Sequence, residues 1–557
     1  MRQIKRIALI EPEAPGFHVF SHFKMPRLGL PLLGAILSHR GYDVSIYATH
    51  LSKEDLRHCF DCDLIGISST TSTAPEAYRL ADLFRSRGKT VVIGGVHASF
   101  LSEEALEHAD FVVRGEGEDS FPELIRRIEA DELPHDVPGV SYRDGESVVH
   151  NPKPQLIEDL DRLPFPDFSL LKPKPRLFNV PVQTSRGCPF PCNFCNVTQM
   201  FGRKVRFRSV QHVLDEMAQL PKQEIFFYDD NFCSNPKYTK ELCEGILRRG
   251  LKPRYSSAQV RADVTRDLEL MDLLSRSGVD LVYVGFESVN PDTLKEYDKH
   301  QTVEEITKAM EIFRRFKIRV HGMFVIGSDH DSIHAARETL EFVRQQRIET
   351  IQFMMLTPIP GTGLYQQLCA ENRIITKDWK LYDAHHAVYL PKRMSSEELQ
   401  NTTFEAMSRF YSLREGLRGL AKRDLYQASR RFMGWYIIKR WKWANRGWLT
   451  ALRAQTVKAQ RAALNRRLED IQRQLEELLR AARGQLSPLG FKVEELRKKM
   501  EGYYKEISRI SREVFSAFED DLTAIERRTE EISAAVRKTL EEFKAISKSV
   551  QKNTLRS

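Results

Sequence analysis

The chain has 557 residues, 41% hydrophobic and 29% charged, and this length excludes one compact domain because a single core rarely grows past about 250 residues. Its net charge of +9 does not by itself indicate a nucleic-acid partner. Eight cysteines are too few for a disulfide scaffold. The sequence contains no run of about 18 apolar residues, so it predicts no membrane span. Residues 1–11 are too charged for a signal peptide, so we expect a cytoplasmic protein.

The first part of the chain alternates short apolar strands with helical patterns. The strands are IALI, DVSIYA, DLIGIS, TVVIGG and DFVVRG, and helical patterns cover 29–40 and 74–87. This alternation predicts an open α/β sheet of the Rossmann type over residues 1–140. Small residues stand where its strands end, at Gly66, Ser68, Ser69, Gly94, Gly95, Gly115 and Gly117. Such folds bind ligands at this carboxyl edge, so we expect a ligand there.

A proline-rich stretch over residues 141–178 predicts an extended connector. After it, six strand patterns alternate with helical patterns: VPVQTS, EIFFYDD, RYSSAQV, LVYVGFE, RVHGMFVIG and TIQFMMLTP. Six such units predict a partial (β/α)6 barrel over residues 179–394, shorter than a complete eight-unit barrel. An incomplete barrel leaves a lateral opening, which would suit a large substrate.

The pattern of the segment 395–452 predicts helices, and the segment is rich in basic and aromatic residues. Between residues 414 and 453 there are eleven Lys or Arg against Glu415 and Asp424, together with four of the five tryptophans. This composition is typical of a helix at a membrane interface, where it would place the protein peripherally on the inner face of the membrane. A helix that closes the barrel with its aromatic face inward is an equal alternative. Single-stranded RNA is a third, but no RNA-binding module accompanies the segment, so we do not expect a nucleic-acid partner.

The tail, residues 453–557, carries apolar residues at spacings of three and four with no strand pattern. Such heptads predict a coiled coil, broken near Gly484 and Pro488. Self-association through residues 453–550 and an intramolecular helical hairpin both satisfy the pattern.

The most specific chemical pattern is the run Cys188-x3-Cys192-x2-Cys195, directly after the first barrel strand. Three thiolates this close can hold an iron-sulfur cluster from one loop and leave one iron open. A zinc knuckle would need a fourth ligand, and the next histidine, His212, falls in a helical pattern. The pair Cys59 and Cys62 has no partner pair, so we expect two buried thiols there.

This triad resembles the signature of the radical SAM superfamily, and the resemblance covers about residues 4–415. It implies that Cys188, Cys192 and Cys195 bind a [4Fe-4S] cluster whose open iron chelates S-adenosylmethionine. Reductive cleavage of that molecule would release a 5′-deoxyadenosyl radical. Phe194 is similar to the family's apolar residue near the adenine, although ordinary loop packing would explain it equally well.

Polar residues at the later strand ends are the further cofactor-binding candidates, because sites of barrel enzymes collect at the carboxyl edge. These are Asp229, Asp230, Asn231, Gln259, Arg261, Glu287 and Ser288. Capping of the following helix is the alternative role of the Asp and Asn side chains. The resemblance implies that Glu287 binds the nucleoside part of S-adenosylmethionine, where a carboxylate forms short charge-assisted hydrogen bonds. Gly327-Ser328 and Pro358 to Gly361 are expected to shape the backbone.

The first domain resembles the cobalamin-binding domain that precedes the radical SAM domain in one large subfamily. Its candidate cofactor-binding residues are Ser68, Ser69, Thr70, Gly94, Gly95 and Gly115. The D-x-H-x-x-G motif of many such domains is absent, and His18 and His22 lie in the corresponding loop without it. We therefore expect cobalamin to bind without a protein histidine ligand. A domain that keeps the fold without the cofactor is the alternative.

Together these patterns predict a radical SAM enzyme that abstracts hydrogen from an unactivated carbon, with no catalytic residue assigned. The resemblance implies cobalamin-dependent C-methylation, and the basic aromatic segment favours a lipid, isoprenoid or porphyrin-like substrate. The alternatives are cobalamin-independent cyclisation or carbon-carbon coupling, as in the anaerobic porphyrin-ester cyclase, and a methylthiotransferase-like RNA modification. The last usually needs a second cysteine triad, which the sequence lacks. An external one-electron donor, such as a ferredoxin or flavodoxin, is expected.

Overall fold

The computed structural model of the chain describes residues 3–19, 25–48, 50–173, 179–220 and 224–458, and the single positions Arg466, Glu469, Asp470 and Arg473. The chain divides into two units, residues 1–449 and 450–557. The predicted coiled coil and self-association, from residue 459 onward, lie outside the described residues apart from those four positions. His22 lies outside them too.

The first domain is built on a seven-stranded sheet with the order β2-β1-β3-β4-β5-β6-β7. Its strands are β1 (Arg6–Ile10), β2 (Asp43–Tyr47), β3 (Leu64–Ser68), β4 (Thr90–Gly94), β5 (Phe111–Val113), β6 (Val140–Asp144) and β7 (Ser147–His150). The first five are parallel, and they are the five strands that the sequence predicts. Strand order reverses between β1 and β3, which makes this the point where such sheets bind ligands.

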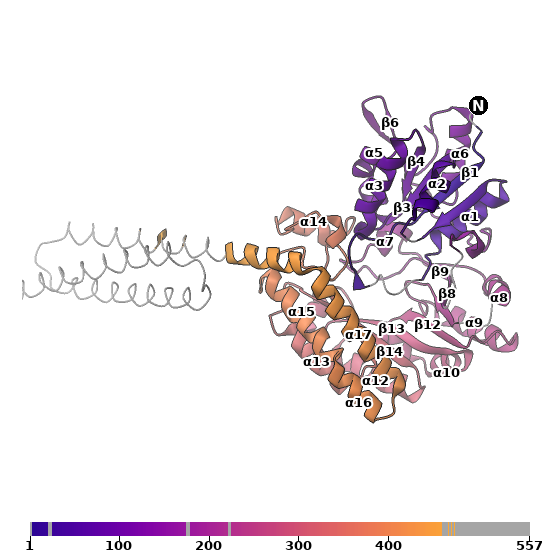
Figure 1. The fold of residues 1–557 in the computed structure, drawn as a ribbon. Helices are drawn as coiled ribbons and strands as arrows, with labels where there is room; N and C mark the ends of the chain where they lie inside the picture. The colour runs from indigo at the N-terminus through magenta and orange to yellow at the C-terminus, as the bar shows by residue number, and fades with distance from the viewer. Residues whose placement is uncertain are drawn as a thin grey trace, which may run out of the picture. The chain divides into compact units, whose positions relative to one another are not determined.

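Helices cover both faces of this sheet (Figure 1). The helices are α1 (Gly29–His39), α2 (Lys53–Phe60), α3 (Ala74–Arg85), α4 (Val96–Phe100), α5 (Ser102–His108) and α6 (Ser120–Ala130). Side chains of α1 and α6 pack on one face, and those of α2, α3 and α5 on the other. Cys59 and Cys62 lie in the second core, where they are buried as predicted.

The antiparallel hairpin β6–β7 extends this sheet into the stretch that the sequence analysis assigns to a connector. Gly145 and Glu146 form its turn between the paired residues Asp144 and Ser147, and Gly145 has a φ of 58°. A glycine at the first position of a two-residue turn is a hairpin signal. The prolines that follow it dominate the composition of the stretch, which is why the hairpin was not predicted.

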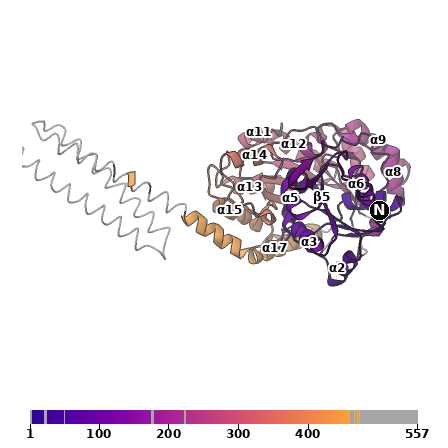
Figure 2. The same ribbon diagram turned by 90° about the horizontal axis from the view of Figure 1, so that it is seen from above.

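The second sheet is a six-stranded parallel sheet with the order β15-β14-β13-β12-β11-β8, in which neighbouring strands are consecutive barrel strands of the sequence. Its strands are β8 (Asn179–Val182), β11 (Glu224–Phe227), β12 (Tyr255–Val260), β13 (Val279–Glu287), β14 (Arg319–Ile326) and β15 (Thr350–Met355). The helices between them are α8 (Val210–Gln219), α9 (Pro236–Arg248), α10 (Leu268–Ser277), α12 (Val303–Arg315) and α13 (Ala335–Gln345). Figure 2 shows α8, α9, α12 and α13 around the periphery. The predicted partial (β/α)6 barrel is therefore confirmed.

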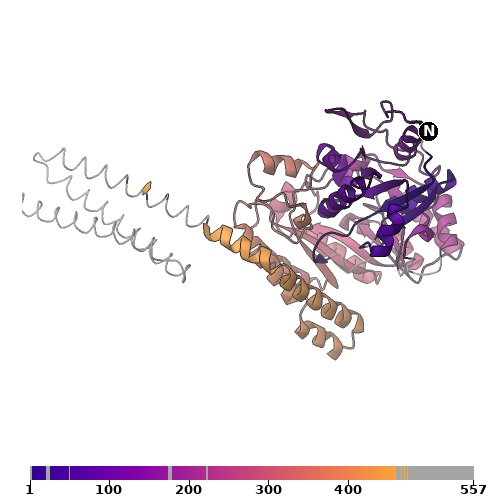
Figure 3. The same cartoon turned by 45° about the horizontal axis from the view of Figure 1, so that its top comes forward.

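Three further helices follow the barrel: α15 (Ser396–Phe410), α16 (Leu413–Ala421) and α17 (Leu425–Ala444). Helices α16 and α17 form an antiparallel hairpin, visible as adjacent orange helices in Figure 3. The hairpin packs closely because Gly416 has no side chain where the Phe432 ring lies, 2.5 Å from the position of a Cβ. The side chains of Trp441 and Phe404 stack at 4.0 Å and join α17 to α15. None of the described helices has both the length and the apolar content that a bilayer crossing requires.

Candidate cofactor site

The cysteine loop spans residues 187–205 and is closed at its base by a two-stranded ladder. Strands β9 (Ser185–Arg186) and β10 (Arg206–Phe207) pair antiparallel on either side of it. Gly187 begins the loop with a φ of 95°, and a Cβ there would lie 2.9 Å from the Lys204 carbonyl. Glycine is therefore required at this turn, and the loop starts and ends at one fixed place.

Asp229 fixes the entry to this loop from the end of β11. Its Oδ1 accepts hydrogen bonds from the Thr184 backbone N–H at 3.0 Å and the Ser185 hydroxyl at 2.7 Å. Burial raises the pKa of Asp229 to about 7, against the lowering effect of these bonds. Asp229 is thus a positioning residue for the cysteine loop. This role differs from both roles that the sequence left open, cofactor binding and capping of the following helix.

The three thiols lie partly buried in the loop, and burial raises the pKa of each in the free protein, to about 12 for Cys195. The cations of Arg261 and Lys299 act on Cys192 in the opposite direction. In the described part of the chain, no three His, Cys, Asp or Glu side chains converge as ligands of a single ion. In a four-iron cluster each cysteine binds a different iron, so its ligands stand apart. Three separate thiols beside two cations fit an anionic cluster.

Arg261, at the end of β12, packs directly on the cysteine loop. Its guanidinium lies 3.7 Å from the centre of the Phe190 ring and donates to the Lys299 carbonyl at 2.6 Å. The side chain is buried, and its Nε makes no hydrogen bond among the described residues but lies 3.6 Å from Oδ2 of Asp263, within ion-pair distance. The Nε donor can still serve a bound ligand.

Glu287, at the end of β13, forms a buried ion pair with Lys299, at 2.7 Å between Oε1 and Nζ. The pair occupies space that Gly285 leaves open, because a Cβ there would lie 2.5 Å from the carboxylate. Glu287 has a φ of 63° beside a shift in strand register. The sequence pointed to Glu287 but not to Lys299, which follows the short helix α11 (Pro291–Glu296) and carries no local signal.

Phe194, between two of the cysteines, makes a T-shaped contact with the ring of the fully buried Tyr297, at 5.0 Å between centroids. This contact packs the cysteine loop against the barrel, and the adenine contact of Phe194 stays a prediction.

The other candidates at this edge take structural roles in the free protein. Gln259 donates to the Asp230 carbonyl at 3.3 Å, and the Ser288 hydroxyl accepts from the Asn290 N–H at 3.0 Å. Burial raises the pKa of Asp230 to about 6. Asn231 is buried beside them, and its carbonyl accepts from the Ser234 N–H. Their contacts with a cofactor stay predictions.

The concave face of the barrel is lined by aromatic and sulfur-containing side chains. The ring of Phe226 lies 5.6 Å from that of Tyr283, although β12 separates their strands. Tyr283 in turn lies 4.9 Å from His321. Val282 and Val284 are fully buried and alternate with Tyr283, so the rings point away from the outer helices. These three side chains stay partly exposed.

The predicted small residues of the first domain do meet at one edge of its sheet. The Ser69 hydroxyl donates to the Gly94 carbonyl at 3.3 Å, and Gly95, at a φ of 92°, has no space for a side chain beside Ser69. Ser99 joins two of the loops, since its hydroxyl donates to the Gly95 carbonyl and accepts from the Gly115 N–H. Ser68 reaches the same place, and Thr70 pairs with Thr73 at the start of the next helix.

His18 lies in the loop after β1, where the subfamily's cobalt ligand would stand, but both of its ring nitrogens are engaged. Nδ1 contacts Asp383 at 2.8 Å and Nε2 lies 2.9 Å from the Pro15 carbonyl. Asp383 also binds His386 at 2.8 Å. This buried cluster joins the first domain to the segment after the barrel, so His18 has a structural role here.

Glu116, three residues after the end of β5, joins the first domain to the cysteine loop. Its carboxylate binds Arg186 of β9 and Arg206 of β10, each at 2.8 Å, and all three side chains are buried. It also accepts the Ile157 N–H at 2.9 Å. The carboxyl edges of the two sheets therefore face each other, with the predicted Ser and Gly residues on one side and the cysteines on the other.

Two family models match this chain. The model for the radical SAM superfamily matches residues 182–343, and the model for the B12 binding domain matches residues 21–125. The chain is 31% identical to bacteriochlorophyllide d C-12(1)-methyltransferase of Chlorobaculum tepidum, over 66% of this chain and 79% of that protein. It is 28% identical to hopanoid C-3 methylase of Methylococcus capsulatus, over 71% of this chain and 78% of the methylase.

A cyclase is among the relatives too. The anaerobic magnesium-protoporphyrin IX monomethyl ester cyclase of Cereibacter sphaeroides is 28% identical, over 62% of this chain and 60% of the cyclase. Among solved structures, the cobalamin-dependent S-adenosylmethionine radical enzyme OxsB superposes with a TM-score of 0.62 at 17% identity, over 78% of this chain and 72% of OxsB. That likeness supports the predicted two-domain fold.

Proposed function

This chain belongs to the radical SAM superfamily, in the group that carries a B12-binding domain, and on this premise we propose that it is a C-methylase. Its substrate is a hydrophobic molecule, such as a lipid, an isoprenoid or a porphyrin-like ring, methylated at an unactivated carbon. Its cofactors are a [4Fe-4S] cluster, S-adenosylmethionine and cobalamin. When bound, the cluster supplies the electron that cleaves S-adenosylmethionine, and cobalamin supplies the methyl group.

The residues of this chain have distinct tasks in the proposal. Cys188, Cys192 and Cys195 hold the cluster, and Arg261 and Lys299 balance its negative charge. Glu287 accepts a hydrogen bond from the nucleoside or from the ammonium group of S-adenosylmethionine while it holds Lys299. The facing edge of the first domain holds cobalamin against the mouth of the barrel.

The observation that carries the hydrophobic substrate is the lining of the barrel. Phe226, Tyr283, Met323 and Met354 are uncharged and lie partly exposed on the strands of the barrel. Burial lowers the pKa of His321 to about 4, so this side chain is neutral at neutral pH. This stretch of the lining is uncharged, although the cation of Arg430 lies close enough to act on Tyr283 and His321, and it favours a substrate with a large apolar part.

The experiment uses anaerobically purified protein with a reconstituted cluster, incubated with S-adenosylmethionine, a strong reductant and cobalamin. We expect 5′-deoxyadenosine and S-adenosylhomocysteine together, with cobalamin retained through gel filtration. If neither product forms, the enzymatic proposal is refuted.

A second candidate is radical cyclisation or carbon-carbon coupling without cobalamin, which the similarity to the magnesium-protoporphyrin cyclase favours. It predicts 5′-deoxyadenosine alone from the same incubation, with cobalamin lost on gel filtration. The second cysteine triad of an RNA-modifying methylthiotransferase is absent from the sequence, so we do not propose that activity.

The reaction also needs an external one-electron donor such as a ferredoxin or flavodoxin. Reduction of the cluster by either protein, in place of the chemical reductant, would support this partner. We expect the rate of 5′-deoxyadenosine formation to rise with the donor concentration and then to saturate.

We further propose contact with a membrane surface through residues 414–453. Leu413, Leu417 and Leu420 form an exposed stripe on α16, and Trp443 is 65% exposed. Trp441 is fully buried, and Trp448 is half-buried with its Nε1 bonded to Gln400, so the aromatic residues are divided between the two predicted roles. A peripheral place on the inner face of a membrane would suit this stripe.

The membrane proposal is tested by flotation with anionic liposomes. We expect Leu417→Ser with Leu420→Ser to reduce binding at least several-fold, because the stripe loses most of its buried apolar area. Leu133→Ser is the control, since Leu133 is 45% exposed in the first domain. Equal binding by all variants would contradict the proposal.

A further inference from the structure

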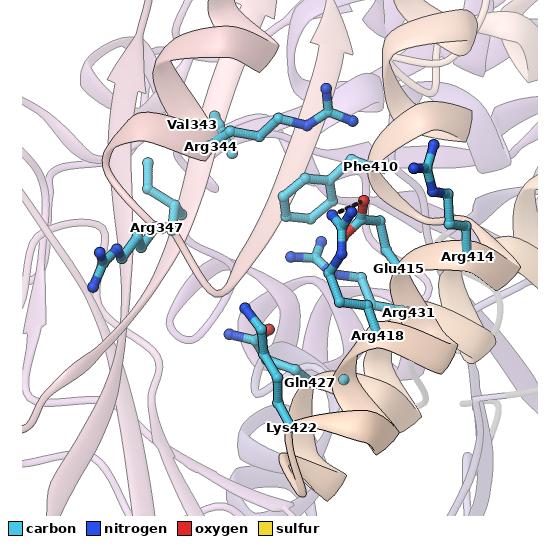
Figure 4. Close-up of a pocket in the computed structure, with 12 residues that line it drawn as sticks. Val343, Arg344, Arg347, Phe410, Arg414, Glu415, Arg418, Lys422, Gln427 and Arg431 are labelled. Atoms are coloured by element: carbon cyan, nitrogen blue, oxygen red, sulfur yellow. Dashed lines mark hydrogen bonds and ion pairs between the residues drawn. The ribbon is translucent and has the colours of Figure 1, made fainter.

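A cavity of about 710 Å³ lies between the barrel and the helices that follow it. Its walls come from the end of α13, the end of α15, and the hairpin α16–α17 (Figure 4). Arg344 reaches from α13 toward the side chains of the hairpin in that view. The volume is in the range of sites that take small organic ligands.

This cavity is separate from the cofactor site. Arg344 and Arg347 lie just before the first residue of β15, Thr350, and therefore at the amino edge of the strands. The cysteines follow the carboxyl end of β8. Tyr411 bonds the backbone of Ile351 near the same amino edge, which keeps the hairpin in place there.

The cavity has a strong excess of positive charge. Its cations are Arg344, Arg347, Arg414, Arg418, Lys422 and Arg431. Glu415 is its one lining carboxylate, and it forms an ion pair with Arg418 at 2.8 Å. The side chains of Arg347, Arg414 and Lys422 have no hydrogen-bond or ion-pair partner within the described part of the chain. Five of the six cations are exposed to solvent, which screens their repulsion, and together they attract an anion to the cavity.

Arg431 is the second and independent observation. Its side chain is 8% exposed and lies flat on Phe410, with 3.4 Å between the guanidinium carbon and the ring centre. Its Nη1 has no hydrogen-bond partner among the described residues, and burial lowers its pKa. A buried guanidinium with an open donor is costly in a free protein and suits the planar, two-point binding of an oxyanion.

The apolar part of the lining indicates what the anion is attached to. Val343, Ile348 and Phe410 lie in the wall beside the cations. Inorganic phosphate alone would leave most of this volume unfilled. A ligand with both an organic part and several negative charges would fill it and match both kinds of wall.

We propose that this cavity binds a phosphate or diphosphate ester, with its phosphate groups on Arg431, Arg344 and Lys422. The site is distinct from the proposed radical chemistry and does not depend on it. The ester could belong to a soluble metabolite or to a lipid headgroup. Leu413, Leu417 and Leu420 lie on the other side of α16 from Lys422 and Arg418, so this site does not require the membrane contact proposed above.

The test measures binding of inorganic pyrophosphate to the full-length protein by isothermal titration calorimetry at physiological salt. Arg344→Gln with Lys422→Gln should weaken binding by at least about tenfold, because charge-assisted bonds are lost. Arg337→Gln with Lys439→Gln is the matched control. It removes the same charge from α13 and α17, but neither residue lines the cavity. The control should bind like the wild type.

Arg431→Met keeps the apolar stem on Phe410 and should also weaken pyrophosphate binding about tenfold, with circular dichroism confirming the fold. Vesicles of phosphatidic acid in phosphatidylcholine distinguish the source. Binding of vesicles but not of free pyrophosphate, lost in Arg344→Gln with Lys422→Gln, would assign the site to a lipid headgroup. Binding of neither probe, or equal loss in the control, would overturn the proposal.

Discussion

The cofactor site and the cationic cavity, at opposite edges of the barrel, hold positive charge in different ways. At the carboxyl edge, Arg186 and Arg206 bind Glu116, and Lys299 binds Glu287. At the amino edge, six cations share one carboxylate, and Arg431 is buried on an aromatic ring. Internal ion pairs hold the first edge in one geometry before any cofactor arrives. At the second edge, five of the six cations are exposed to solvent, and the buried Arg431 keeps one donor open to an external anion.

Internal ion pairs at one edge and an open donor at the other suit different functions. Radical chemistry needs its reacting groups held within a narrow geometry, and buried pairs with short contacts provide that. A reversible ligand site needs open donors instead. The following substitutions separate the two cases, from the largest expected effect to the smallest.

Cys192→Ala should abolish formation of 5′-deoxyadenosine, at least about a thousandfold, because a cluster with two protein ligands is not held for reaction. Iron content after reconstitution should fall with it, while circular dichroism stays unchanged. Cys369→Ala in α14 (Gly363–Ala370) is the matched control and should keep both. Full iron content and activity in Cys192→Ala would contradict the assigned cluster.

Glu116→Gln should lower the free energy of unfolding by about 3–5 kcal/mol, because it leaves Arg206 buried without a counter-charge and Arg186 with Glu118 alone. Chemical denaturation measures this. Glu158→Gln is the control, since its pair with Lys204 is exposed and should contribute less than about 1 kcal/mol. Equal losses of stability in the two variants would mean that the buried Glu116 pairs contribute no more than an exposed ion pair.

Asp383→Asn should lower stability by about 2 kcal/mol, with a dependence on pH. Burial acts to raise the pKa of Asp383, but the charges and hydrogen bonds of His386 and His18 hold it well below its ordinary value of 3.8. Burial acts to lower the pKa of His18, but Asp383 raises it above 6.5.

The sign of each shift sets the pH window of this effect. The contribution of Asp383 is present above pH 3.8 and is lost as the pH falls through its lower folded pKa. The contribution of His18 is full below pH 6.5 and is lost as the pH rises through its higher folded pKa. The difference between wild type and Asp383→Asn should therefore be largest between these values. A difference that does not vary with pH would contradict the ion pair.

Arg414→Gln should raise the stability of the ligand-free protein by about 0.5 kcal/mol, the opposite sign to the carboxyl-edge variants. Arg414 stands one turn before Arg418 and near the amino end of α16, where a cation is unfavourable. Thermal unfolding without added phosphate measures the effect. A clear loss of stability would show that the charges at this edge are balanced by the protein after all.

The parallel strands of both sheets could be predicted from the sequence, because each carries its own apolar pattern. The cysteine loop could be predicted from the spacing of its three cysteines. Glu287 could be singled out as a candidate as well, because it ends a predicted strand. Lys299 and Glu116 were not assigned their roles because their partners are distant in the sequence. The cationic cavity has no local signal either, since only tertiary packing brings Arg344 to Arg431.

The local hairpin β6–β7 was missed for a different reason. Its turn glycine, Gly145, is a sound signal, but the strands are short and the prolines after them dominate the composition of the stretch. The two roles predicted for the basic aromatic segment were both physically sound. Trp441 is buried and Trp443 is exposed, and only three-dimensional packing could divide them.

The measurement that tests the central claim most directly uses S-adenosylmethionine labelled with deuterium in its methyl group. The reconstituted protein, with cobalamin and a reductant, is incubated with a lipid and pigment extract, and the products are separated by mass spectrometry. The account predicts an apolar product in which one trideuteromethyl group replaces one hydrogen, formed in step with 5′-deoxyadenosine. Formation of 5′-deoxyadenosine with no labelled apolar product would contradict methyl transfer to a hydrophobic substrate.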